Sequence, residues 1–221
     1  MTAMGEIRPG LLRWELAHPE WTPADAEDGS GWEETVACYG VTTGQELVLV
    51  DPLAPPPDEA EAFWAELDGQ VERSGPPSIL VTIFWHARSS RELVERYPGT
   101  RVWAHEPAEE LVRERTPVTD TFGAGDSLPG EIIAYDAGRA YEVVFWLPEH
   151  RGLVAGDVLL GGGPSGARLC PASWLGRGKT HEDLREALRP LLELPVELLL
   201  LTHGDVVETG ARAALADALT A

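Results

Sequence analysis

Four apolar stretches of the chain each end at a residue that can bind a metal ion or transfer a proton. The residues that end them are Asp51, His86, Asp157 and His203. Carboxylates and imidazoles serve most often as general acids and bases, and they bind zinc and other transition metals. Because polar side chains at the carboxyl ends of strands mark the binding edge of many α/β sheets, these four residues are the first candidates for a site.

Each of these residues also has a structural interpretation. For His86, a hydrogen-bonded role inside the core is as good an interpretation as a working role. His203 is the strongest candidate, because four leucines precede it and a glycine follows, but a loop-orienting role competes. Asp157 is suited to accept backbone amides of its own turn, and Asp51, which Pro52 follows, is expected to order the loops beneath the site.

An arginine and two serines closely follow His86, and a helical pattern comes after them. Arg88 and Ser89 precede a helix predicted over residues 90–97. Ser89 and Glu92 match a capping box, in which the serine accepts from the backbone amide three residues on and the glutamate reaches back. This role is favoured over a nucleophilic role for Ser89.

Turn residues divide the rest of the chain into predicted strands and helices. Two hairpins are predicted, residues 33–42 with 46–50 around Thr43-Gly44-Gln45, and residues 131–135 with 140–147. Further strands are predicted over residues 78–85, 151–160 and 197–202. Helices are predicted over residues 60–71, 107–115, 184–192 and 211–219. The third is expected to be capped by Thr180 and Asp183 and to be kinked or ended early by Pro190. Short connections between strands favour mixed sheets covered by helices.

The composition of the chain disfavours several classes of partner. The chain has 221 residues and a formal net charge of −20, which disfavours a nucleic-acid or anionic membrane partner. Cys38 and Cys170 have no ligand spacing and are expected to be buried thiols. No signal peptide or membrane span is apparent, so a single cytoplasmic domain over residues 1–221 is expected. The glycine-rich segment 161–166 lacks the lysine of a phosphate-binding loop.

The order of these features resembles the metallo-β-lactamase superfamily. Leu49-Val50-Asp51 resembles its early strand–Asp element, Gly156-Asp157 its later bridging aspartate, and Thr202-His203-Gly204 its last histidine ligand. The resemblance implies an α/β (α+β) fold, a four-layer αββα sandwich of two mixed sheets with helices on the outer faces. It also implies a metal site where several loops meet.

The same resemblance predicts that the dinuclear metal site is lost. The family's His-x-His-x-Asp-His motif corresponds to residues 84–89, and only His86 keeps a ligand there. Arg88 replaces the family's aspartate, and Arg139 lies where another histidine is expected. Two permanently charged guanidinium groups beside Asp157 would take the place of the metal ions.

Three hypotheses follow. The first is a metal-free protein that needs no cofactor and keeps a polar pocket built from His86, Arg88, Arg139, Asp157 and His203. It would bind a small molecule, such as a carboxylate or phosphate, with Arg88, Arg139, Ser89 and Asp51 as the ligand-binding residues. The second is a hydrolase with one zinc or other divalent transition ion held by His86, Asp157 and His203, which would then be its catalytic residues. The third is a scaffold for interactions, such as a homodimer, with a filled pocket.

Overall fold

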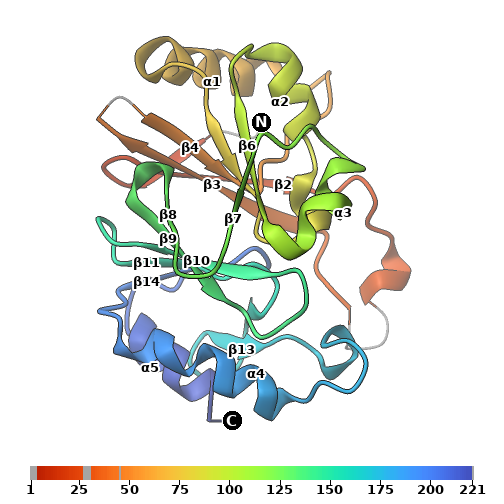
Figure 1. Ribbon diagram of the computed structural model, residues 1–221, viewed down its shortest axis with the longest axis vertical. Helices are drawn as coiled ribbons and strands as arrows, with labels where there is room; N and C mark the ends of the chain where they lie inside the picture. Colours follow the sequence, from red (N-terminus) through yellow and green to blue (C-terminus); the bar gives the residue numbers. More distant parts are fainter. Residues whose placement is uncertain (1–3, 27–30, 45, 221) are drawn as a thin grey trace. The chain divides into compact units, whose positions relative to one another are not determined.

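The chain forms two compact units that interleave along the sequence. The computed structural model describes residues 4–26, 31–44 and 46–220 (Figure 1). The first unit comprises Met1–Leu16, Ala37–Gly123 and Ser127–Glu131, and the second comprises Ala17–Val36, Ala124–Asp126 and Ile132–Ala221. This division does not decide whether the chain is one domain. The single domain expected over residues 1–221 stays a prediction.

The first unit is built on a seven-stranded sheet whose strand order follows the sequence. Its strands are β1 (Gly5–Arg8), β2 (Leu11–Ala17), β3 (Thr35–Thr43), β4 (Glu46–Val50), β5 (Ser78–Leu80), β6 (Arg101–His105) and β7 (Asp120–Phe122). Strands β3 and β4 pair antiparallel, which confirms the first predicted hairpin, although Gln45 of its turn lies outside the described residues. From β4 to β7 the strands are parallel, so their carboxyl ends meet at one edge.

The first unit has helices between its parallel strands and one more after β7. They are α1 (Glu61–Ser74), η2 (Phe84–Ala87), α2 (Ser90–Arg96), η3 (Glu106–Ala108), α3 (Glu109–Arg113) and η4 (Pro129–Glu131), with the short strand β8 (Ser127–Leu128) before η4. Figure 1 shows α1 and α2 on the same side of the sheet. Helix α1 buries Phe63 and Leu67, as its spacing predicts, and Phe63 packs on Trp14 with ring centroids 5.8 Å apart.

In the second unit, neighbouring strands of another sheet follow the order β14-β11-β10-β9. The strands of the second unit are β9 (Ile132–Asp136), β10 (Val143–Leu147), β11 (Gly152–Val154), β12 (Leu159–Gly161), β13 (Ala167–Leu169) and β14 (Leu198–Leu200). Strands β9 and β10 are antiparallel, which confirms the second predicted hairpin, and β11 and β14 are parallel. Strands β12 and β13 form a separate antiparallel pair.

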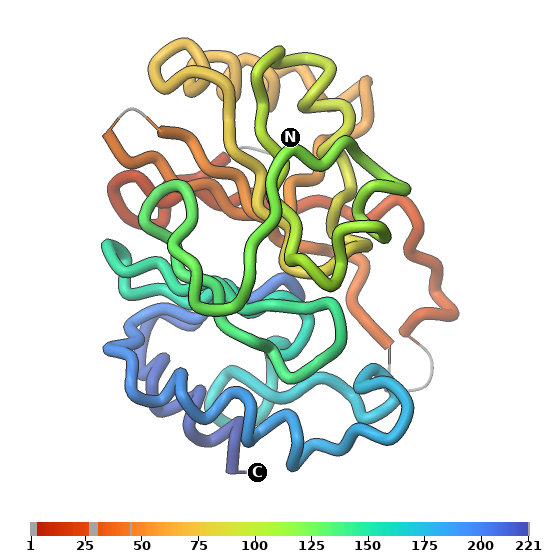
Figure 2. Tube along the Cα trace, viewed as in Figure 1, coloured from red at the N-terminus to blue at the C-terminus, as the bar shows by residue number. Residues whose placement is uncertain are grey.

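The helices of the second unit lie mostly near its carboxyl end. They are η1 (Pro23–Ala26), η5 (Ala172–Trp174), α4 (His181–Leu188), η6 (Arg189–Glu193) and α5 (Ala211–Ala218). Figure 2 shows the blue end of the chain running along these last helices. Thr180 and Asp183 form the predicted capping box of α4, and the α-helix ends at Leu188, just before Pro190.

Two apolar runs are shorter as strands than predicted. The run over residues 78–85 is a strand only to Leu80, because Phe84–Ala87 turns into a 3₁₀ helix that brings His86 back toward the sheet. The run over residues 151–160 is two strands, β11 and β12, separated by the turn that carries Asp157. In both runs the interruption places a polar side chain inside an apolar segment.

Candidate functional site

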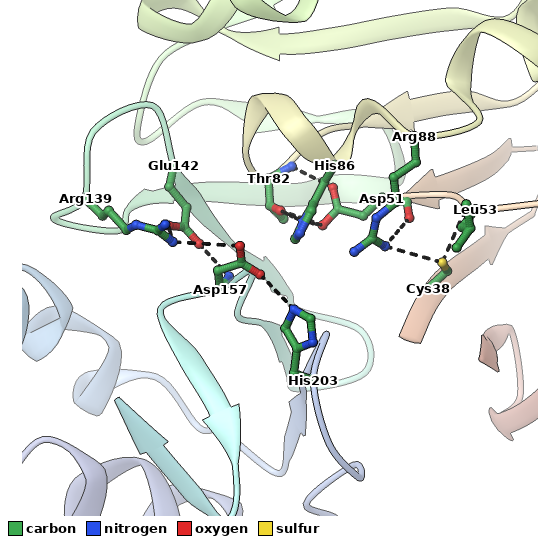
Figure 3. Close-up of polar contacts among 10 residues, drawn as sticks. All are labelled: Cys38, Asp51, Leu53, Thr82, His86, Arg88, Arg139, Glu142, Asp157 and His203. Carbon is green, nitrogen blue, oxygen red and sulfur yellow. Dashed lines mark hydrogen bonds and ion pairs between the residues drawn. The ribbon is translucent and has the colours of Figure 1, made fainter. Parts of the chain in front are cut away.

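In the first unit, Asp51 is the centre of a buried polar network (Figure 3). One oxygen of its carboxylate accepts from the Thr82 backbone amide at 2.8 Å, and the other accepts from the Thr82 hydroxyl at 2.5 Å. His86 Nδ1 lies 2.9 Å from Asp51 Oδ2 and 3.0 Å from Thr82 Oγ1. Because an ionised carboxylate only accepts hydrogen bonds, the contact with Asp51 requires the proton on Nδ1.

This network has features of both interpretations of His86. The ring is buried and hydrogen-bonded, as a core histidine would be. A carboxylate at one nitrogen also fixes the ring for a ligand at the other, the usual arrangement of metal-binding histidines. Sequence reasoning missed Thr82, whose signal was a single hydroxyl within the apolar run Val81 to Ile83.

Arg88 contacts the opposite side of Asp51 from His86 (Figure 3). Its Nη1 donates to the Asp51 carbonyl at 3.1 Å and to Cys38 Sγ at 3.7 Å. Burial raises the pKa of Cys38 to about 11, so this sulfur is a neutral thiol near pH 7. Asp51 and Arg88 have positive φ angles of 51° and 34°, which are uncommon for residues other than glycine. The contact therefore joins two strained backbone positions.

Ser89 does not form the predicted capping box. Its Oγ accepts from the Ala54 amide at 2.9 Å, and no side-chain capping bond forms at the start of α2. Its backbone angles, φ −84° and ψ 12°, differ from the extended conformation that a capping serine adopts. The hydroxyl instead ties the loop after β4 to the start of α2.

In the second unit, Glu142 holds a second network together (Figure 3). The side chain is fully buried, and its Oε2 accepts from Arg139 Nη1 at 2.8 Å. Its Oε1 accepts from the Asp157 backbone amide at 2.5 Å. Arg139 Nη1 lies 3.8 Å from Asp157 Oδ2, close to where the sequence resemblance predicts this guanidinium. Glu142 therefore fixes both Arg139 and the turn that carries Asp157.

Sequence reasoning missed Glu142. The available signal was its position three residues after Arg139, as the one charged residue of the predicted strand over residues 140–147. Acidic side chains are usually exposed, so the burial of this one could not be expected. Its presence changes the charge balance, because Arg139 already has a carboxylate partner other than Asp157.

His203 lies on the other side of Asp157. Its Nε2 is 3.5 Å from Asp157 Oδ1, and its ring centroid lies 5.6 Å from Trp32 and 6.3 Å from Trp174. His203 Nδ1 is buried and has no hydrogen-bond partner among the described residues. A neutral ring with its proton on Nε2, facing the carboxylate, avoids leaving an unsatisfied buried N–H group.

Two glycines set the position of His203. The Gly161 amide donates to the His203 carbonyl at 2.6 Å. A Cβ at Gly204, whose φ is +112°, would lie 2.6 Å from the Gly161 Cα. Close approach of the two backbones thus requires glycine after His203.

The geometry of Asp157 limits the metal ions it can bind. Metal–ligand bonds of about 2.0–2.2 Å in a tetrahedral site separate neighbouring ligand atoms by roughly 3.3–3.6 Å. The distance of 3.5 Å between His203 Nε2 and Asp157 Oδ1 fits two ligands of one ion. On the other oxygen, Oδ2, the Arg139 guanidinium lies 3.8 Å away. His203 and Asp157 therefore have the spacing of two ligands of one ion, with a guanidinium group near the second carboxylate oxygen.

Comparison with known structures identifies the fold. A metallo-beta-lactamase from Pontibacter korlensis is 16% identical with a TM-score of 0.69, and the match covers 100% of this chain and 99% of that one. A metallo-beta-lactamase family protein from Thermus thermophilus is 19% identical, with coverage of 97% and 79% and a TM-score of 0.63. The mono-zinc form of the metallo-beta-lactamase FIM-1 from Pseudomonas aeruginosa is 13% identical, with coverage of 99% and 95% and a TM-score of 0.66.

The chain therefore has the metallo-β-lactamase fold, with mixed α/β structure and two large sheets as the sequence resemblance predicts. No family model matches the sequence, and no curated protein is recognisably similar to it. None of the helices in the described part of the chain has the length and apolarity needed to cross a membrane. His86 belongs to the first unit, and its predicted action together with Asp157 and His203 stays a prediction.

Proposed function

We propose that this protein binds a small molecule and has no dinuclear metal centre. The position of Arg139 supports this proposal, because its guanidinium lies at the Asp157 oxygen that a second ion would need. Two unit charges about 4 Å apart repel each other by about 4 kcal/mol at an effective dielectric constant of 20, and a divalent ion roughly doubles this. Glu142 offsets part of the repulsion, but both of its oxygens already accept hydrogen bonds.

The surroundings of His203 indicate the kind of ligand. Trp32 and Trp174 are partly exposed, and their rings lie at steep angles to the His203 ring, so indole surfaces border the polar pair. Indole rings bind planar apolar groups and cations. Because Glu142 already balances the charge of Arg139, the surroundings of His203 favour such a ligand over the carboxylate or phosphate expected from Arg139 alone.

Elemental analysis of protein purified without chelators tests the metal-free proposal. We expect zinc, iron and manganese well below one ion per chain. About one tightly held ion per chain would overturn the proposal and favour the second candidate.

The second candidate is a hydrolase with one metal ion. The separation of 3.5 Å between His203 Nε2 and Asp157 Oδ1 favours it, as it matches two ligands of one ion. The ion would activate a bound water, and His86 is the predicted third ligand. Of the similar structures, FIM-1 is described in a mono-zinc form.

Calorimetric titration with zinc tests this candidate. If it holds, His203→Ala and His86→Ala each lose zinc binding, whereas His105→Ala, a histidine on β6, keeps it. Equal zinc binding by all three variants would contradict the candidate.

A further inference from the structure

We propose that the second unit binds a small organic acid in a cavity beside β13, α4 and α5. The cavity has a volume of about 450 Å³, and none of its lining residues belongs to the Arg139–Glu142–Asp157 network. Pockets that hold small molecules usually measure about 300–1,000 Å³. The inference is therefore independent of the function proposed above.

One part of the cavity wall is apolar and is closed by the glycine-rich segment. Pro164, Ala167, Leu169 and Ala218 provide this part. Gly163 also lines the cavity, and a Cβ at this position would lie 2.7 Å from the Ala167 carbonyl oxygen. Only glycine allows the segment to close so tightly, which gives the run of glycines a role other than phosphate binding.

Another part of the wall is basic. Arg168 and Arg185 line the cavity, and Arg185 also lines an adjoining hollow of about 370 Å³ together with Arg189. Two carboxylates lie at these hollows. Asp217 accepts a hydrogen bond from Ser165, and Glu182, which is 74% exposed, lies 3.8 Å from Arg185. Three arginines against two carboxylates leave a local positive charge.

This local charge is opposite in sign to the net charge of the chain, which has 37 acidic and 17 basic residues. Among the described residues, eight arginines form ion pairs with carboxylates. Arg151 and Glu197, for example, lie 2.7 Å apart in the second unit. Arg168 and Arg189 form no ion pair with any carboxylate of the described residues. Guanidinium groups that line a cavity without such a partner are suited to bind a carboxylate from a ligand.

His181 adds a further polar group to the wall. Its Nε2 lies 2.8 Å from the Cys170 carbonyl, so this nitrogen donates and Nδ1 is the other polar edge of the ring. An apolar wall beside two guanidinium groups fits a ligand with a compact apolar body and one acidic group. Benzoate has this chemistry, and benzamide has the same shape without the charge.

The test compares benzoate and benzamide by ¹H–¹⁵N NMR titration of the full chain. We expect benzoate to shift the amides of residues 163–169 and benzamide to leave them largely unshifted. In the double variant Arg168→Gln with Arg185→Gln, benzoate affinity should fall at least about tenfold, since the loss of charged hydrogen bonds costs more than one factor of ten in binding. Arg151→Gln is the matched control and should bind benzoate like the wild type.

Three results would overturn the proposal. They are equal shifts with benzamide and benzoate, unchanged affinity in the double variant, and benzoate shifts that avoid residues 163–169. Spectra of the free double variant that match those of the wild type elsewhere show that its fold is intact.

Discussion

The two polar networks stabilise a buried aspartate in different ways. Around Asp51 the partners are a backbone amide, a hydroxyl and an imidazole, none of which carries a permanent charge. Around Asp157 the network includes a permanent cation, and a second buried acid, Glu142, holds that cation. Neutral donors can be lost singly at modest cost, whereas a buried charge that loses its partner is strongly destabilising. The second network should therefore be the more fragile of the two.

The largest expected effect is that of Glu142→Ala. The substitution leaves the Arg139 charge buried without its main partner and leaves the Asp157 amide without an acceptor. We expect the free energy of unfolding to fall by about 3–5 kcal/mol, as measured by urea denaturation. Glu197→Ala breaks the exposed pair with Arg151 and is the control, with an expected loss of no more than about 1 kcal/mol. Similar losses in both variants would contradict the contrast.

A smaller effect is expected for Thr82→Val in the first network. The substitution keeps the shape of the side chain but removes the hydroxyl that donates to Asp51, while the backbone amide and His86 remain. We expect a loss of about 1–3 kcal/mol in the same urea experiment. Thr121→Val, on the exposed side of β7, should change stability by less than about 0.5 kcal/mol. A cost of Thr82→Val that equals or exceeds that of Glu142→Ala would reverse the predicted order.

The smallest effect concerns the position of one proton on each histidine. His86 faces its carboxylate through Nδ1, and His203 faces its carboxylate through Nε2. In the metal-free protein we therefore expect opposite tautomers, with the proton on Nδ1 of His86 and on Nε2 of His203. Long-range ¹H–¹⁵N spectra of the imidazole rings measure this directly. The same tautomer in both residues would show that one carboxylate contact is absent in solution.

Much of the fold could be predicted from the sequence, because the periodicity of apolar residues and the turn residues are local signals. Both hairpins and the capping box at Thr180 were predicted in this way and are confirmed. Ser89 carries the same local signal but is bonded to Ala54, 35 positions earlier. A local sequence pattern carries no information about a contact between residues 35 positions apart.

The site could be predicted only in part, for the same reason. Asp157, His203 and Arg139 were found because they end strands or occupy positions that a known family uses. Glu142 and Thr82 were not found, because their roles depend on burial and on partners that only the folded chain supplies. The sequence therefore predicted the presence of an arginine beside Asp157 but not the acid that holds it.

A zinc titration of two proteins tests most directly the claim that Arg139 takes the place of a metal ion. The proteins are the wild type and the double variant Arg139→Gln with Glu142→Gln, which removes both charges and keeps groups of similar size that can form hydrogen bonds. The account predicts no tight zinc binding by the wild type and measurable binding by the variant, because Asp157 then has no cation beside it. Tight binding of about one zinc ion per chain by the wild type, unchanged in the variant, would contradict it.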